Sequence, residues 1–156
     1  MRQTAVAVER VKYGMGGGIY RIVASAEETG NALFAFEATE PPGGGPPLHI
    51  HTREDEFFLV LDGDVTFYID GQVIRRGPGG SAFVPRGAAH CFRNTSDRAA
   101  RLLVLFTPGD IEGFFEYGAA VNGAPPSEEL MMERLIALSE PFGLQVLGPS
   151  PLEGSK

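Results

Sequence analysis

The chain has 156 residues, the usual length of one domain, and its apolar (43%) and charged (21%) contents are typical of globular proteins. Its net charge of −7 disfavours nucleic acid as a partner, because an acidic surface repels phosphates. Its apolar runs are far shorter than the ~20 residues that cross a bilayer, and residues 1–12 carry charges where a secretory leader is apolar. With one cysteine, Cys91, we expect no internal disulfide and a cytoplasmic location.

The 21 glycines and 12 prolines separate short apolar runs, which predicts an all-β fold with many turns. The first predicted strands cover residues 19–25 and 31–38. Residues 41–47 (PPGGGPP) then form a turn-rich stretch that leads into a strand with two histidines. Because this stretch is short and runs directly into that strand, we interpret it as part of the domain and not as a linker.

The clearest hairpin joins residues 56–61 to residues 65–70. Asp70-Gly71 then suits a type I′ turn, whose residues adopt positive φ. The remaining predicted strands cover residues 73–75, 81–84, 90–93 and 101–107. Eight or nine short strands with frequent turns predict a jelly-roll barrel over residues 1–109.

Residues 110–156 differ in character and predict a helical tail that packs on the barrel or on a partner subunit. Helices are expected over residues 110–120 and 127–139. Ser127 is the expected N-cap of the second helix, since two glutamates occupy its first turn and an apolar stripe follows at helical spacing.

All three histidines lie in the β region: His49, His51 and His90. His49 and His51 are two residues apart, so on a strand their side chains point to the same face. Three acids, at positions 54–56, follow them. Imidazoles with a carboxylate suit one divalent ion, and Fe(II), Mn(II), Ni(II), Co(II) or Zn(II) are all compatible with such a donor set.

Two longer patterns resemble the two conserved motifs of the cupin superfamily. Residues 43–63 match the first motif and residues 79–94 the second. The matching positions are Gly43-x5-His49-x-His51-x4-Glu56-x6-Gly63 and Gly79-x5-Pro85-x-Gly87-x2-His90-x3-Asn94. The resemblance implies a cupin barrel with one metal ion held by His49, His51, Glu56 and His90, and it selects Glu56 among the three acids. Glu54 and Asp55 are then expected to be solvated turn charges.

A narrower resemblance, carried by residues 43–71 and by the tail sequence LQVLGPSP, is to single-domain bacterial cupins similar to quercetin 2,3-dioxygenase. It implies a dioxygenase with Fe(II) as the favoured ion, Glu56 as general base, and a small aromatic or enolisable substrate. A metal-dependent isomerase or epimerase of a small polar molecule and a non-catalytic binding protein remain alternatives.

Phe58 and Phe92 are the expected apolar walls of a substrate pocket, since they alternate in phase with Glu56 and His90. Phe34, Phe36, Phe67 and Phe106 are interpreted as barrel core. Residues 102–106 are apolar on both faces, which together with the family resemblance predicts a homodimer.

Overall fold

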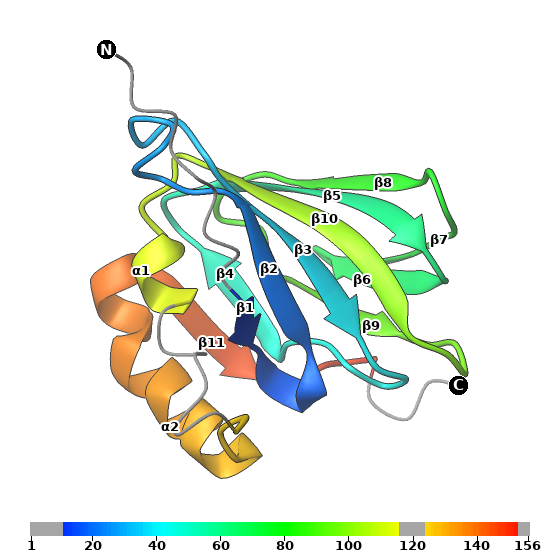
Figure 1. Cartoon of the computed structure of the whole chain (residues 1–156). Helices are drawn as coiled ribbons and strands as arrows, with labels where there is room; N and C mark the ends of the chain where they lie inside the picture. The colour runs from blue at the N-terminus through cyan, green and yellow to red at the C-terminus, as the bar shows by residue number, and fades with distance from the viewer. Residues whose placement is uncertain (1–10, 116–123, 153–156) are drawn as a thin grey trace.

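Two facing antiparallel sheets with helices at one end form the molecule, seen in a computed structural model that describes residues 11–115 and 124–152 (Figure 1). Sheet A has the strand order β1-β2-β3-β10-β5-β8, and sheet B the order β11-β4-β9-β6-β7. Sheet A contains β1 (Val11–Tyr13), β2 (Ile19–Ala24), β3 (Phe34–Glu40), β5 (Asp55–Asp62), β8 (Ser81–Val84) and β10 (Ala100–Thr107). Sheet B contains β4 (Leu48–His51), β6 (Val65–Ile69), β7 (Gln72–Arg76), β9 (His90–Asn94) and β11 (Leu144–Gly148). The predicted jelly roll is confirmed.

The core lies between the two sheets, and the two longest strands, β5 and β10, alternate buried and more exposed positions along most of their length. On β10, Leu102, Val104 and Phe106 point inward and are at most 1% exposed, whereas Leu103 and Leu105 lie on the outer face. Phe34 and Phe36 of β3 complete the same buried layer with Phe106. Period-two alternation of this kind places one row of side chains in the core and the other on the surface.

The bounds of β3, α1 and α2 differ from those predicted from the sequence. The strand expected over residues 31–38 begins only at Phe34, because Asn31 has a φ of 65° and belongs to the preceding turn. Helix α1 covers Glu112–Phe115, and the rest of the predicted segment to residue 120 lies outside the described residues. Helix α2 covers Glu128–Ser139, and its predicted N-cap is confirmed, since Ser127 Oγ accepts a hydrogen bond from the Leu130 amide.

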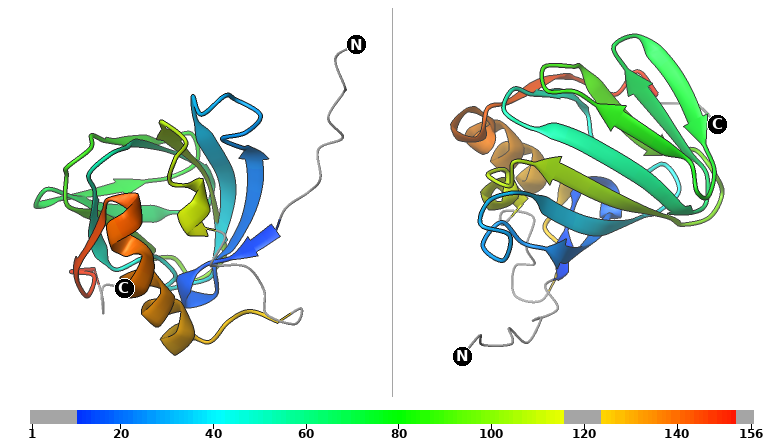
Figure 2. Two further views of the ribbon diagram at one scale, coloured as in Figure 1. Left: turned by 90° about the vertical axis from the view of Figure 1, so that its left-hand side faces the viewer. Right: turned by 90° about the horizontal axis from the view of Figure 1, so that it is seen from above.

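The tail also contributes a strand that its sequence does not reveal. After the short 3-10 helix η3 (Glu140–Phe142), β11 adds to sheet B beside β4, with Leu144 opposite His51 and Val146 opposite His49. Helix α2 packs against β11, α1 and the 3-10 turn η1 (Met15–Gly17). The tail therefore lies at one end of the barrel, next to the strand that carries two histidines (Figure 2). Within the described parts of the chain, no helix is long and apolar enough to cross a membrane.

The proline- and glycine-rich stretch before β4 packs closely on sheet B. Gly45 has a φ of +151°, and a Cβ added there would lie 2.0 Å from the carbonyl oxygen of Phe92. Asn94 is buried and secures the same region, because its side-chain amide donates to the carbonyls of Glu40 and Arg98. Residues 41–47 are thus part of the domain.

Candidate metal centre

The four predicted ligands come from both sheets and meet inside the barrel. His49 and His51 project from β4, and His90 opens the neighbouring strand β9, where it lies opposite His49 in the register. Glu56 reaches the same point from β5 in sheet A. All four side chains are buried, and one donor atom from each lies within 4.8 Å of every other.

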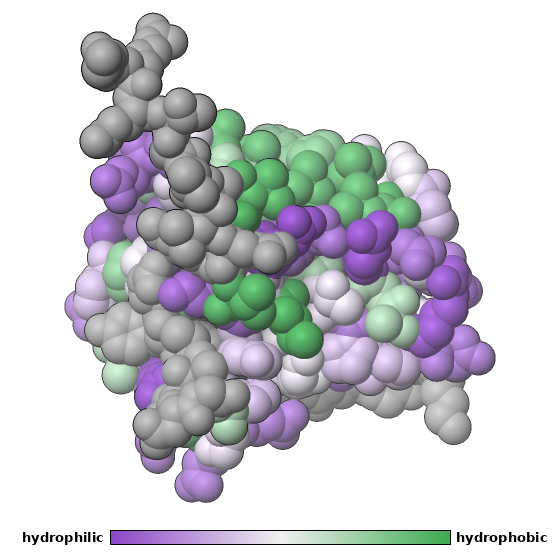
Figure 3. Space-filling model, in the orientation of Figure 1, coloured by the Kyte–Doolittle hydropathy of each residue, from purple (hydrophilic) through white to green (hydrophobic). Residues whose placement is uncertain are grey.

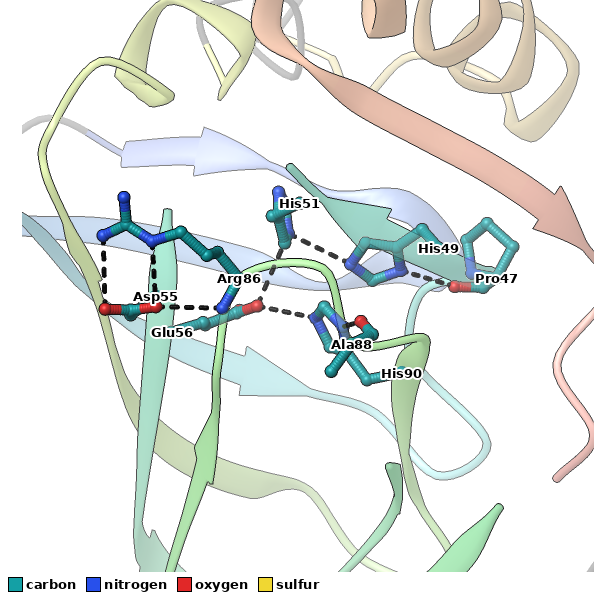
Figure 4. Close-up of polar contacts among 8 residues, drawn as sticks. All are labelled: Pro47, His49, His51, Asp55, Glu56, Arg86, Ala88 and His90. Atoms are coloured by element: carbon teal, nitrogen blue, oxygen red, sulfur yellow. Dashed lines mark hydrogen bonds and ion pairs between the residues drawn. The ribbon is translucent and has the colours of Figure 1, made fainter. Parts of the chain in front are cut away.

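The donor atoms point toward one another (Figure 4). His90 Nε2 lies 2.7 Å from Glu56 Oε2, and His51 Nε2 lies 3.4 Å from the same oxygen. His49 Nε2 is 3.2 Å from His51 Nε2. Ligands that bind one ion at about 2.1 Å and at right angles lie about 3 Å apart, so these spacings fit a shared divalent ion.

Backbone carbonyls hold two of the imidazoles in the orientation that a metal ligand needs. His49 Nδ1 lies 2.7 Å from the carbonyl of Pro47, and His90 Nδ1 lies 2.9 Å from that of Ala88. A proton on Nδ1 that is donated to a carbonyl leaves the Nε2 lone pair free for the ion. His51 Nδ1 has no hydrogen-bond partner among the described residues.

Burial keeps the two histidines of β4 neutral. It lowers the pKa of His49 to about 3 and that of His51 well below its usual value, and neighbouring imidazoles lower both further. Burial also opposes protonation of His90, but the charge and the hydrogen bond of Glu56 raise its pKa above the ordinary value. Three convergent imidazoles and one carboxylate, two of the imidazoles neutral, therefore make a donor set that fits a late divalent metal.

These pKa shifts predict how metal affinity depends on pH. Of the three imidazoles, only His90 has a pKa above its ordinary value, so as the pH falls a metal ion competes with about one proton for them. We expect affinity to fall about tenfold per pH unit below the raised pKa of His90. Titration of the metal-free protein with Co(II) between pH 5 and 8 measures this slope. A flat profile, or one near a thousandfold per unit, would contradict it.

The two other acids of the first motif have different roles. Asp55 binds the backbone amide and the guanidinium of Arg86, which hold its pKa below the usual value (Figure 4). This contact ties β5 to the turn before His90. Glu54, expected to be solvated, is instead 1% exposed, and burial raises its pKa to about 7. Neither acid belongs to the four-residue cluster.

A largely apolar cavity with a volume of about 90 Å³ opens beside the cluster. His49, His51 and Glu56 form part of its wall, and the tail forms another part through Phe114 and Phe115 of α1. The remaining apolar lining comes from the barrel, the stretch before β4, α2 and β11: Phe36, Pro46, Pro47, Phe92, Val104, Phe106, Met131, Leu135 and Leu144. The cavity is thus built jointly by the barrel and the tail.

The two predicted pocket phenylalanines lie in different places. Phe92 lines the cavity. Phe58 packs in the core, with its ring 5.1 Å from that of Phe67 and 5.5 Å from that of Phe92. Phe36 and Phe106, interpreted as core from the sequence, line the cavity as well. Strand alternation predicts whether a side chain points inward, but not how far along the barrel it lies. Phe58 is therefore assigned to the cavity, and Phe36 and Phe106 to the core, although the structure places them the other way round.

Comparison with known proteins agrees with the observed fold. The family described as "Cupin domain" matches residues 36–106. Quercetin 2,3-dioxygenase from Bacillus subtilis is 28% identical over 139 residues, which cover 86% of this chain and 41% of that protein. The chain spans less than half of the length of the curated relatives that it matches.

Solved structures with related folds come from proteins with different described activities. A predicted oxalate decarboxylase from Thermotoga maritima has a TM-score of 0.57 and 24% identity, covering 65% of this chain and 92% of that one. A sugar phosphate isomerase from Silicibacter pomeroyi has the same TM-score and identity, with coverage of 64% and 71%. At this identity the likeness concerns the fold.

Proposed function

Because the chain belongs to the cupin superfamily, we propose that it is a metal-dependent dioxygenase that acts on a small aromatic or enolisable oxygenated substrate. One observation carries the proposal: four buried metal-type donors converge beside an apolar cavity. The similarity to quercetin 2,3-dioxygenase over 86% of the chain supports the same activity.

In this proposal His49, His51, Glu56 and His90 hold one divalent ion, with Fe(II) favoured. Such an ion, when bound, supplies open positions for a substrate oxygen and for dioxygen. Glu56 lines the cavity, so its carboxylate is placed to accept a proton from a substrate hydroxyl. The phenylalanines exclude water and contact the apolar body of the substrate.

The cavity lining favours this activity over isomerisation of a sugar. A sugar needs several polar partners for its hydroxyl groups. Apart from the proposed ligands, the polar side chains of the described lining are Tyr13, Tyr20 and Arg134. An aromatic or enolic substrate with few oxygens matches this lining better.

Oxygen consumption tests the proposal directly. The protein would be reconstituted anaerobically with Fe(II), Mn(II) or Ni(II) and then supplied with oxygen and with flavonols, catechols or 1,3-diketones. We expect uptake that requires both metal and substrate and that is lost in His49→Ala. Metal-loaded protein without uptake on any of these substrates would favour the isomerase or the binding protein.

We also propose that the protein forms a homodimer through the outer face of sheet A. Apolar side chains from three adjacent strands, β8, β5 and β10, gather there, and Phe57 lies opposite both Phe83 and Leu105. Figure 3 shows this apolar area along the upper edge of the molecule. Phe83 is 58% exposed, and the contacts of α2 lie at the far end of the barrel.

Charges beside this face suit a second copy of the same chain. Glu37 forms ion pairs with Arg21 and Arg101 at the edge of the apolar area. A two-fold interface brings the same surface from both copies, so a rim that carries both signs can pair with itself.

Light scattering would measure the mass in solution. We expect a dimer for the wild type and a monomer for Phe83→Lys. Val73→Lys, which changes an exposed apolar residue of β7 in sheet B, should leave the dimer intact. A monomeric wild type would refute this interface.

A further inference from the structure

A buried carboxyl group lies on the inner face of sheet A, outside the cluster of proposed metal ligands. Glu40, at the end of β3, is 0% exposed, and neither of its carboxyl oxygens has a hydrogen-bond partner among the described residues. A buried polar group without a partner costs free energy, so such groups usually have a structural or functional cause.

Two glycine-rich segments make room for this carboxyl. A Cβ added at Gly18 would lie 2.6 Å from Glu40 Oε2, and one added at Gly44 would lie 2.8 Å from the same oxygen. These glycines belong to the turn before β2 and to the stretch before β4. The chain therefore encloses Glu40 with backbone on two sides, and no cationic side chain of the described residues forms an ion pair with it.

Tyr20 is a neighbour of Glu40 on the inner face of sheet A, since it lies opposite Ala38, which is two residues before Glu40 on β3. It lines the cavity, and its ring packs 4.7 Å from that of Phe36 and 5.8 Å from that of Phe115. Its hydroxyl end lies against the backbone of the same turn, because a Cβ at Gly14 would be 2.6 Å from Tyr20 Oη. Burial raises the pKa of Glu40 to about 8, and interaction with the neighbouring Tyr20 lowers this pKa by a smaller amount.

We propose that Tyr20 is the substrate-positioning hydroxyl of the cavity and that Glu40 orients it from behind. The proposal rests on the proposed function and narrows its substrate class. A substrate held at the metal through one oxygen would place a second oxygen against Tyr20, with its apolar body along the phenylalanines. A cavity of about 90 Å³ holds roughly six to nine water-sized atoms, so a compact one-ring compound with oxygens at both ends fits best.

Two probes that differ by one hydroxyl test the role of Tyr20 in binding. Catechol and 1,2,4-benzenetriol would be titrated anaerobically into Zn(II)-loaded protein and followed by calorimetry. We expect the triol to bind about fivefold more tightly than catechol, as one added hydrogen bond allows. Tyr20→Phe should remove that difference and leave catechol unchanged, whereas Tyr68→Phe on β6 should preserve it.

A second measurement, on metal-free protein, tests the contact with Glu40. The ¹³Cζ chemical shift of Tyr20, assigned by its loss in Tyr20→Phe, reports on the environment of its hydroxyl. We expect Glu40→Gln to move this shift and Glu37→Gln, on the outer face of the same strand, to leave it in place.

The two readouts separate this inference from the proposed function. Equal affinity of both probes for the wild type, or an unchanged preference in Tyr20→Phe, would overturn the positioning role. An unmoved Tyr20 shift in Glu40→Gln would overturn the role of Glu40. If neither probe binds, the proposed chelation at the metal is wrong, and the positioning role of Tyr20 is wrong with it. The ¹³Cζ chemical shift of Tyr20 would still show whether Tyr20 contacts Glu40.

Discussion

Replacing Glu56 with glutamine is expected to lower the affinity for a divalent ion by at least about 100-fold. The carboxylate of Glu56 is the negative member of the cluster, and its Oε2 lies within 3.4 Å of the Nε2 atoms of both His51 and His90. A neutral amide cannot supply the charge of an anionic ligand, and changes even to groups behind the ligands typically cost 10- to 100-fold in affinity. Competition with a chromophoric chelator, using Co(II) or Zn(II), measures the loss.

Glu54→Gln supplies a matched control for this variant. Glu54 is a buried glutamate two positions away and lies outside the cluster, so its replacement removes a similar buried carboxyl without removing a ligand. We expect metal affinity within about threefold of the wild type. If Glu56→Gln and Glu54→Gln lose the same metal affinity, loss of any buried carboxyl in this segment would explain the effect. Glu56 would then not be supported as a ligand.

Replacing Glu40 with glutamine is expected to change how stability depends on pH. Burial raises the pKa of Glu40 from 4.5 to about 8, so between these values the native state holds a proton that the unfolded state has released. The free energy of unfolding of the wild type should therefore fall as pH rises through this window, by about 4 kcal/mol from this one group. Glutamine does not titrate, and the variant should lack that decline.

Urea unfolding of the metal-free proteins at pH 5 and pH 9 gives the comparison. The variant should gain about 4 kcal/mol over the wild type between the two pH values. Glu37→Gln, which removes a carboxyl from the outer face of β3, should follow the wild type. Parallel pH profiles for the wild type and Glu40→Gln would contradict a strongly raised pKa.

The four ligands were predictable because their constraint is local in sequence. The spacing of His49 and His51 places both side chains on one face of β4, and the motif that contains His90 includes the turn before β9, the strand that His90 opens. The matching motifs then select Glu56 among three consecutive acids. Spacing along one strand thus paired His49 with His51, and the motif resemblance added Glu56 and His90.

The cavity was much less predictable because its wall comes from distant parts of the chain. Phe114 and Leu144 line it only because the tail folds back over the barrel and β11 pairs with β4. Strand β11 has only five residues and lies in a segment whose sequence otherwise favours helices, so its short pattern did not predict a strand. Likewise, no local pattern indicates that Glu40 is enclosed by Gly18 and Gly44, since these contacts join three separate segments.

The most direct test of the metal centre is a crystal structure of Co(II)-loaded protein with diffraction data collected at the cobalt edge. The four buried donors predict one anomalous peak per chain, bound by Nε2 of His49, His51 and His90 and by the carboxylate of Glu56. A peak at another position, or protein that stays metal-free with excess Co(II) at pH 8, would contradict the proposed site.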